Sequence, residues 1–122
     1  MTRLTPKQLG AKAEQAAERY LVAKGLKLLT RNFNSRFGEV DLIMRDKKSL
    51  VFIEVRMRNN PKFGSAFDSV DIHKQQRLYR AACYYLITQK VEQNCPMRFD
   101  VIAVNSTNFS IEWLKNAFEV EW

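Results

Sequence analysis

The sequence predicts an α/β fold in one domain, residues 1–122, with the element order α-β-β-β-α-β-β. Two long stretches space their apolar residues three or four positions apart, as amphipathic helices do, and five shorter apolar segments end at turn residues. No repeat, linker or low-complexity tract divides the 122 residues. We therefore expect both helices and all strands to belong to one compact domain.

The first helix is expected between Thr5 and Gly25. Thr5 can cap it, Pro6 suits the first helical position, and Gln8 completes a capping box three residues after Thr5. The apolar residues that recur along one side are Leu9, Ala13, Ala16, Ala17, Tyr20 and Leu21. This pattern indicates a helix with one buried face.

Three strands are predicted next, over residues 27–33, 39–44 and 50–55, and turn residues separate them. An antiparallel meander is the simplest arrangement of strands that follow each other so closely. After a polar loop around Asn59 and Pro61, either Ser69 or Asp71 can cap a second helix that runs to about Lys90. Residues 98–104 and 110–114 are the last two predicted strands.

The turn around Lys47 places two acids opposite each other. A loop of two or four residues pairs positions whose numbers add up to 95, so Asp41 then lies across from Glu54, whereas an odd loop length would separate them. Arg56 projects to the same face as Glu54. Two like charges in opposed positions are destabilising unless something neutralises them, and a divalent cation is the expected neutraliser.

The alternative is that Asp41 and Glu54 are ordinary solvated strand residues. Against it, both lie inside strongly apolar strands, where an ionised group needs a partner or a metal. A third acid, Glu14, borders the apolar stripe of the first helix, and Glu18 one turn later is its rival. Glu14 taken alone would be an ordinary boundary residue paired with a lysine.

Together these residues resemble the YraN-type family of bacterial proteins, whose function is not established. That family is in turn similar to archaeal Holliday junction resolvases and to the PD-(D/E)xK nuclease superfamily. The resemblance spans residues 10–104 and implies a restriction endonuclease-like core, with a mixed central sheet flanked by helices, and a metal-dependent phosphodiesterase site. The residues that carry it are Gly10, Glu14, Ala17, Tyr20-Leu21, Arg31-Asn32, Gly38-Glu39-Val40-Asp41-Leu42-Ile43, Phe52-Ile53-Glu54-Val55-Arg56, Phe63-Gly64, Lys74 and Arg98-Phe99-Asp100.

By position, the resemblance makes Glu14, Asp41 and Glu54 the ligands of Mg²⁺ or Mn²⁺. It also makes Asp41, Glu54 and Arg56 catalytic residues. Arg56 stands where most relatives carry lysine, and an arginine can clamp a phosphate but cannot relay a proton. Lys74 is either a second source of positive charge at the site, and so catalytic, or a solvent-facing helix lysine.

The net charge of +7 comes from the first 90 residues, which hold 18 basic and 8 acidic side chains, whereas residues 91–122 hold 2 and 5. This surplus predicts a nucleic-acid partner, DNA first. A non-catalytic nucleic-acid-binding module and a structural or adaptor protein are the alternatives to a nuclease. The residues expected to contact nucleic acid are Arg36, Arg56, Arg58, Lys62, Lys74 and Arg77.

Other classes of protein are disfavoured. The longest apolar run, residues 81–87, falls short of the roughly 20 residues that span a bilayer, and no signal-peptide core is present, so we expect a cytoplasmic protein without a membrane partner. Two cysteines and one histidine do not make an ordinary structural zinc site. Asp100 alternates with Arg98 on the polar face of a strand and is interpreted as the structural partner of a nearby basic residue, with a metal role as the alternative. Because junction resolvases act as dimers, the resemblance also implies a homodimer.

Overall fold

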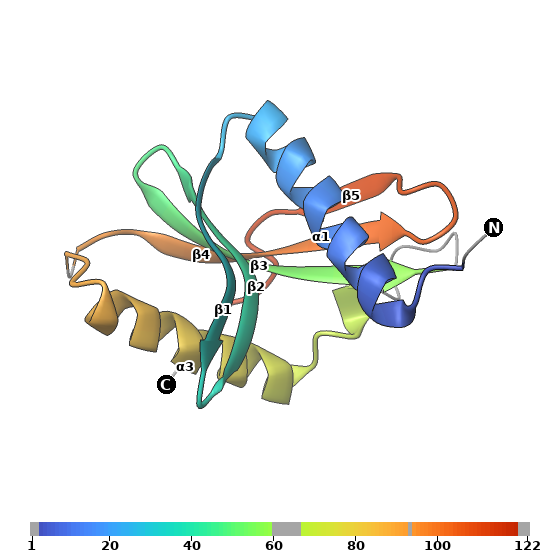
Figure 1. The fold of residues 1–122 in the computed structure, drawn as a ribbon. Helices are drawn as coiled ribbons and strands as arrows, with labels where there is room; N and C mark the ends of the chain where they lie inside the picture. The colour runs from blue at the N-terminus through green and yellow to red at the C-terminus, as the bar shows by residue number, and fades with distance from the viewer. Residues whose placement is uncertain (1–2, 60–66, 93, 120–122) are drawn as a thin grey trace.

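The computed structural model describes residues 3–59, 67–92 and 94–119, and in it two long helices cover opposite faces of a five-stranded sheet (Figure 1). The predicted order α-β-β-β-α-β-β is confirmed. In chain order the elements are α1 (Pro6–Ala23), β1 (Lys27–Ser35), β2 (Gly38–Asp46), β3 (Ser49–Arg58), α3 (Ile72–Thr88), β4 (Met97–Asn105) and β5 (Ile111–Leu114).

The sheet is mixed, as the resemblance implies. Its strands lie in the order β1-β2-β3-β4-β5; β3 and β4 are parallel, and the other neighbouring pairs are antiparallel. The meander β1-β2-β3 is therefore confirmed, and α3 makes the crossover between the two parallel strands. The first four strands run beyond the predicted ends because turn residues also pair, as Ser35 does with Gly38 and Asp46 with Ser49.

Both helices begin at predicted caps. The Gln8 N–H donates to the Thr5 hydroxyl at 3.1 Å and the Thr5 N–H donates to the Gln8 side chain at 2.8 Å, which completes the capping box. Gly25 follows the end of α1 with a φ of +101°, a conformation that glycine adopts without strain. Of the two caps considered for α3, the structure uses Asp71, whose carboxylate accepts the Lys74 N–H at 2.9 Å.

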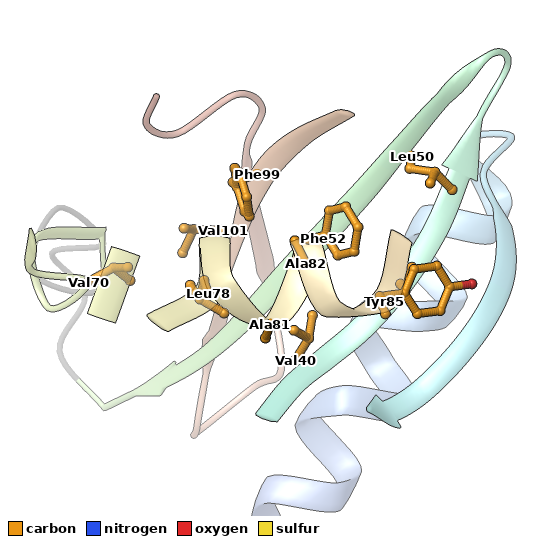
Figure 2. Close-up of a cluster of buried hydrophobic side chains, with 11 residues drawn as sticks. Val40, Leu50, Phe52, Val70, Leu78, Ala81, Ala82, Tyr85, Phe99 and Val101 are labelled. Carbon is orange, nitrogen blue, oxygen red and sulfur yellow. The ribbon is translucent and has the colours of Figure 1, made fainter. Parts of the chain in front are cut away.

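Two hydrophobic clusters, one on each face, hold the helices to the sheet. Figure 2 shows the cluster under α3, where Leu78 and Tyr85 of the helix lie against Phe52 and Val101 of the strands. The cluster under α1 takes the alternate strand residues, such as Ile53, together with Ala13, Ala17 and Leu21 of the helix. Because side chains alternate along β3, Glu54 continues the face that α3 covers.

A buried ion network joins the strand ends, and it confirms the structural role predicted for Asp100. Asp100 is 1% exposed, and the Arg98 Nε lies 3.0 Å from its Oδ1. The Trp113 indole N–H and the Asn116 backbone N–H each donate to the same carboxylate at 2.9 Å, and Arg98 also pairs with Asp46 at 2.9 Å. Asp100 is thus fully engaged by protein donors. No helix among the described residues is both long enough and apolar enough to cross a membrane.

Candidate active site

The candidate site lies where β2 and β3 separate. The two strands pair from Asp46 with Ser49 as far as Leu42 with Ile53, in the predicted register. Asp41 and Glu54 are the next residues along the two strands, and beyond them the strands diverge (Figure 1). The Val55 N–H therefore donates to the Asp41 carboxylate, at 2.8 Å, instead of to a strand carbonyl. The break in the ladder creates a backbone donor, and Asp41 uses it.

Asp41 lies beside Glu54, and a hydrogen bond links their side chains. Burial raises the pKa of Asp41 to about 8, and the negative charge of Glu54 and a hydrogen bond to it act in the same direction. The Val55 N–H opposes the shift because it stabilises the ionised form, and Glu14 adds a small further increase. Glu54 itself is 4% exposed. The register alone predicts this meeting of two acids, and the structure brings them together.

Two cations from different elements pair with Glu54. Its Oε2 lies 2.9 Å from the Arg56 Nη2 and 3.4 Å from the Lys74 Nζ. Lys74, in the first turn of α3, therefore points to the site and is not the solvent-facing lysine of the alternative. The Arg56 Nε is buried and has no hydrogen-bond partner among the described residues. Arg56 thus keeps one unsatisfied donor inside the site.

Glu14 approaches the pair from α1, on the other side of the sheet. Partial burial raises the pKa of Glu14, and the charges of Glu39 and Glu54 raise it further. With its amide nitrogen turned toward the acids, Asn32 lies 2.8 Å from the Oε1 of Glu14 and 2.8 Å from the Oε1 of Glu39. Glu14 of α1 is therefore influenced by acids from two other elements, Glu39 of β2 and Glu54 of β3.

Asn32 and Glu39 also belong to this site, although the sequence did not predict a role for either of them there. Glu39 lies two positions before Asp41, but Val40 packs in the cluster under α3 and Leu42 in the cluster under α1, so the regular alternation of β2 breaks between them and gives no signal that places Glu39 at the site. Asn32 has a φ of +50°, which asparagine tolerates better than most residues, inside an otherwise extended strand. Nothing in the apolar pattern of β1 predicts that kink.

The rival acid Glu18 belongs to a different contact. Its two carboxylate oxygens accept hydrogen bonds from the Arg31 guanidinium at 2.7 and 2.9 Å. This pair and Glu14 border a cavity of about 480 Å³ between α1 and the sheet, which reaches the candidate site at Asn32 and Leu42. Asp41 and Glu54 do not line the cavity, so it adjoins the acid pair without enclosing it.

The donor set suits a hard divalent cation. Mg²⁺ and Mn²⁺ prefer carboxylate oxygens, and Mg²⁺ commonly takes only one or two protein carboxylates, with water and phosphate completing its shell. Within residues 3–59, 67–92 and 94–119, no group of three or more acids, histidines or cysteines is already set to hold a metal. The carboxylates that could hold such an ion are therefore those of Asp41 and Glu54, and Glu14 lies beside them.

Arg36 and Arg77, two of the predicted nucleic-acid contacts, lie beside the same turn. Arg36 is exposed between β1 and β2, and its guanidinium carbon stacks 4.9 Å from the Phe37 ring centroid. Arg77 is exposed on α3, and its Cδ lies near Gly38 of the turn. The two arginines thus add positive charge on the α3 side of the sheet, the side that presents Lys74.

The remaining predicted nucleic-acid contacts lie in different surroundings. Arg56 and Lys74 are the two cations at Glu54. The Arg58 guanidinium donates to the Met57 carbonyl at 2.7 Å, and its side chain makes no other hydrogen bond with the residues that the structure describes. Lys62 falls outside the described residues.

Comparison with known proteins gives the family. The chain matches Uncharacterised protein family UPF0102 over residues 13–104. The chain belongs to the UPF0102 family. A UPF0102 protein of Nitrosococcus oceani is 50% identical over 119 residues, and the aligned region covers 96% of this chain and 96% of the other. A UPF0102 protein of Legionella pneumophila (strain Corby) is 44% identical over 110 residues, 90% of this chain and 93% of the other. Another, of Nitrosospira multiformis, is 44% identical over 120 residues, 98% of this chain and 99% of the other.

The UPF0102 assignment confirms the YraN-type resemblance seen in the sequence. The matched region contains every residue of the candidate site: Glu14, Asp41, Glu54, Arg56 and Lys74. The site therefore lies within the UPF0102 domain itself and not in an extension peculiar to this chain.

Proposed function

We propose that this UPF0102 protein is a divalent-metal-dependent endonuclease that hydrolyses phosphodiester bonds in structured or branched DNA. The observation that carries the proposal is the meeting of Asp41 and Glu54 with Arg56 and Lys74 where β2 and β3 separate. Two carboxylates that disfavour each other's charge, with two cations beside them, form a charge arrangement suited to a metal and a phosphate.

Each side chain has a defined task in this proposal. Asp41 and Glu54 would hold Mg²⁺ or Mn²⁺, with Glu14 as the additional acid, and the ion would polarise the phosphate and lower the pKa of a water molecule. Arg56 can hold two phosphate oxygens with its planar fork. Lys74 can stabilise the charge that develops on the phosphate, and its ammonium can give a proton to the leaving oxygen.

The surroundings favour a nucleic-acid substrate. Arg36 and Arg77 are exposed on the same side of the sheet as Lys74, so a phosphate backbone at the site would meet further positive charge. The net charge of +7 acts in the same direction at longer range. If the substrate is a four-way junction with two symmetric cuts, a homodimer would supply both sites.

A non-catalytic nucleic-acid-binding module is the second candidate. The observation that favours it is that Glu54 already pairs with both Arg56 and Lys74. These two cations neutralise the negative charge that Glu54 would otherwise offer to a metal ion. Arg56 is also an arginine where most relatives carry lysine, and an arginine cannot act as a base.

Cleavage of labelled DNA separates the two candidates. The purified protein is incubated with a four-way junction, a flap and a linear duplex in Mg²⁺, in Mn²⁺ and in EDTA, beside Asp41→Asn and the matched control Asp68→Asn at an exposed carboxyl. We expect metal-dependent cleavage that falls about 100-fold or more in Asp41→Asn and is unchanged in Asp68→Asn. Cleavage of none of the substrates, or equal cleavage by Asp41→Asn, refutes the nuclease, and binding without cleavage supports the module.

A further inference from the structure

A second hollow lies at the far end of β2 and β3 from the acid pair. Its volume is about 630 Å³, and its walls come from the end of α1, the turn between β2 and β3, and strands β4 and β5. The basic side chains that line it are Arg98 and four lysines: Lys24, Lys47, Lys48 and Lys115. These four are called the hollow lysines below.

The hollow lysines form no ion pair within the described part of the chain. Asp46, which also lines the hollow, and the buried Asp100 both pair with Arg98, at 2.9 and 3.0 Å. Among the ion pairs of the described residues, none includes a hollow lysine. Arg98 is thus neutralised by Asp46 and Asp100, whereas the four ammonium groups around the hollow have no acidic partner among residues 3–59, 67–92 and 94–119. Like charges in such proximity repel one another and attract an anion.

Two aromatic rings hold two of these lysines in place without neutralising them. The Lys24 Nζ lies 5.4 Å from the ring centroid of Tyr20, and the Lys115 Nζ lies 4.5 Å from the ring centroid of Trp113. The two rings meet edge to face at 6.3 Å. A ring attracts an ammonium through its quadrupole but carries no net charge, so both lysines keep their full charge for a ligand.

The hollow and the acid pair are separate in space. Asp46 and Asp41 are five residues apart on β2, which is about 17 Å along an extended strand. The hollow and Lys74 also lie on different faces of the sheet. Trp113, which lines the hollow, packs in the cluster under α1, whereas Lys74 reaches the acid pair from α3. One straight segment of nucleic acid bound at Glu54 would therefore not fill the hollow.

We propose that the hollow is a second, metal-independent phosphate site, which binds the backbone of a nucleic-acid segment other than the one presented to Asp41 and Glu54. Four lysines without an ion-pair partner in the described residues surround one hollow, and they match a ligand with closely repeated anions, such as a phosphodiester chain with one charge per nucleotide. The inference rests on the proposed function only in taking nucleic acid as the ligand. A protein with both sites would hold two segments at once, as a branched substrate offers.

The test compares two double variants that remove the same charge. Lys24→Gln/Lys48→Gln removes two hollow lysines, and Lys7→Gln/Lys12→Gln removes two exposed lysines from the first half of α1. Binding of a fluorescein-labelled DNA duplex is measured by anisotropy in EDTA over a range of salt concentrations. If each hollow lysine contacts one phosphate, the slope of log K against log salt falls by about 1.8 in the hollow variant. The control variant should lose less than half of that.

Equal losses in both variants, or no loss in the hollow variant, overturn the inference, because binding would then depend on diffuse charge or on another surface. Polyglutamate serves as the competing anion: if the hollow variant loses polyglutamate binding and keeps its duplex slope, the hollow serves an acidic polypeptide and the inference is wrong. Cleavage in Mg²⁺ is a separate readout. If the salt slope falls in the hollow variant but no DNA is cleaved, only the nuclease proposal is wrong. If DNA is cleaved but the salt slope of the hollow variant is unchanged, only the second phosphate site is wrong.

Discussion

Replacing Asp41 with asparagine should stabilise the protein, and increasingly so as the pH rises. The Asp41 carboxyl makes two contacts that an amide can reproduce, because an amide oxygen can accept the Val55 N–H and an amide nitrogen can donate to Glu54. The asparagine carries no charge, so it avoids both the burial of a carboxylate and its repulsion by Glu54.

The size and sign of the effect follow from the pKa of Asp41, which the fold raises from 3.8 to about 8. Between these two values the folded state binds more protons than the unfolded state, so the stability that this group contributes falls as the pH rises, and it becomes constant above about pH 8. From about pH 5 to about pH 8 the wild type should lose about 4 kcal/mol relative to Asp41→Asn. Near pH 4 the two proteins should be close in stability, because Asp41 is then protonated in the folded state.

Urea unfolding followed by circular dichroism measures this difference. Wild type, Asp41→Asn and the control Asp68→Asn are unfolded in EDTA at several pH values within that window. Asp68→Asn makes the same chemical change at an exposed position and should track the wild type. A difference between Asp41→Asn and wild type that does not vary with pH, or a variant that is less stable at alkaline pH, would refute the account of the buried acid pair.

Three further predictions test the rest of the argument. Saturating Mg²⁺ should raise the Tm of the wild type more at pH 8 than at pH 6, because the ion must displace the Asp41 proton below its pKa of about 8, and it should not raise the Tm of Asp41→Asn. Arg98→Met should lower the free energy of unfolding by about 3 kcal/mol, because it leaves the 1%-exposed Asp100 without its cation while Trp113 still donates to it; urea titration checks this. Thr5→Ala should lower it by about 1 kcal/mol through loss of the helix cap, measured in the same way.

The parts of the structure that the sequence predicts are those set by local rules. The parity of a two-residue turn decides which residues of β2 and β3 face each other, so the approach of Asp41 to Glu54 follows from a count along the chain. The cap at Thr5 likewise depends on side chains three residues apart. These contacts need no knowledge of how the layers pack.

The parts that the sequence leaves open depend on that packing. Lys74 could face either solvent or the site, and the choice is made by where α3 sits on the sheet, which Leu78 and Tyr85 fix through the cluster under the helix. The contact of Asn32 with Glu14 requires α1 to lie over the other face and the backbone of β1 to take a positive φ. Neither condition has a signature in the apolar pattern.

The same break in the sheet explains why an acid at position 41 indicates function. An uninterrupted ladder would have paired the Val55 N–H with a carbonyl, whereas the divergence of β2 and β3 gives that donor to the Asp41 side chain. An asparagine there would keep the hydrogen bond without burying a charge next to Glu54, so a purely structural requirement favours the amide over the acid. What the carboxylate adds is a negative charge that a cation can bind once the proton leaves. The destabilising acid therefore supports the proposed metal-ligand role over a structural one, and the pH dependence of Asp41→Asn measures how large that destabilisation is.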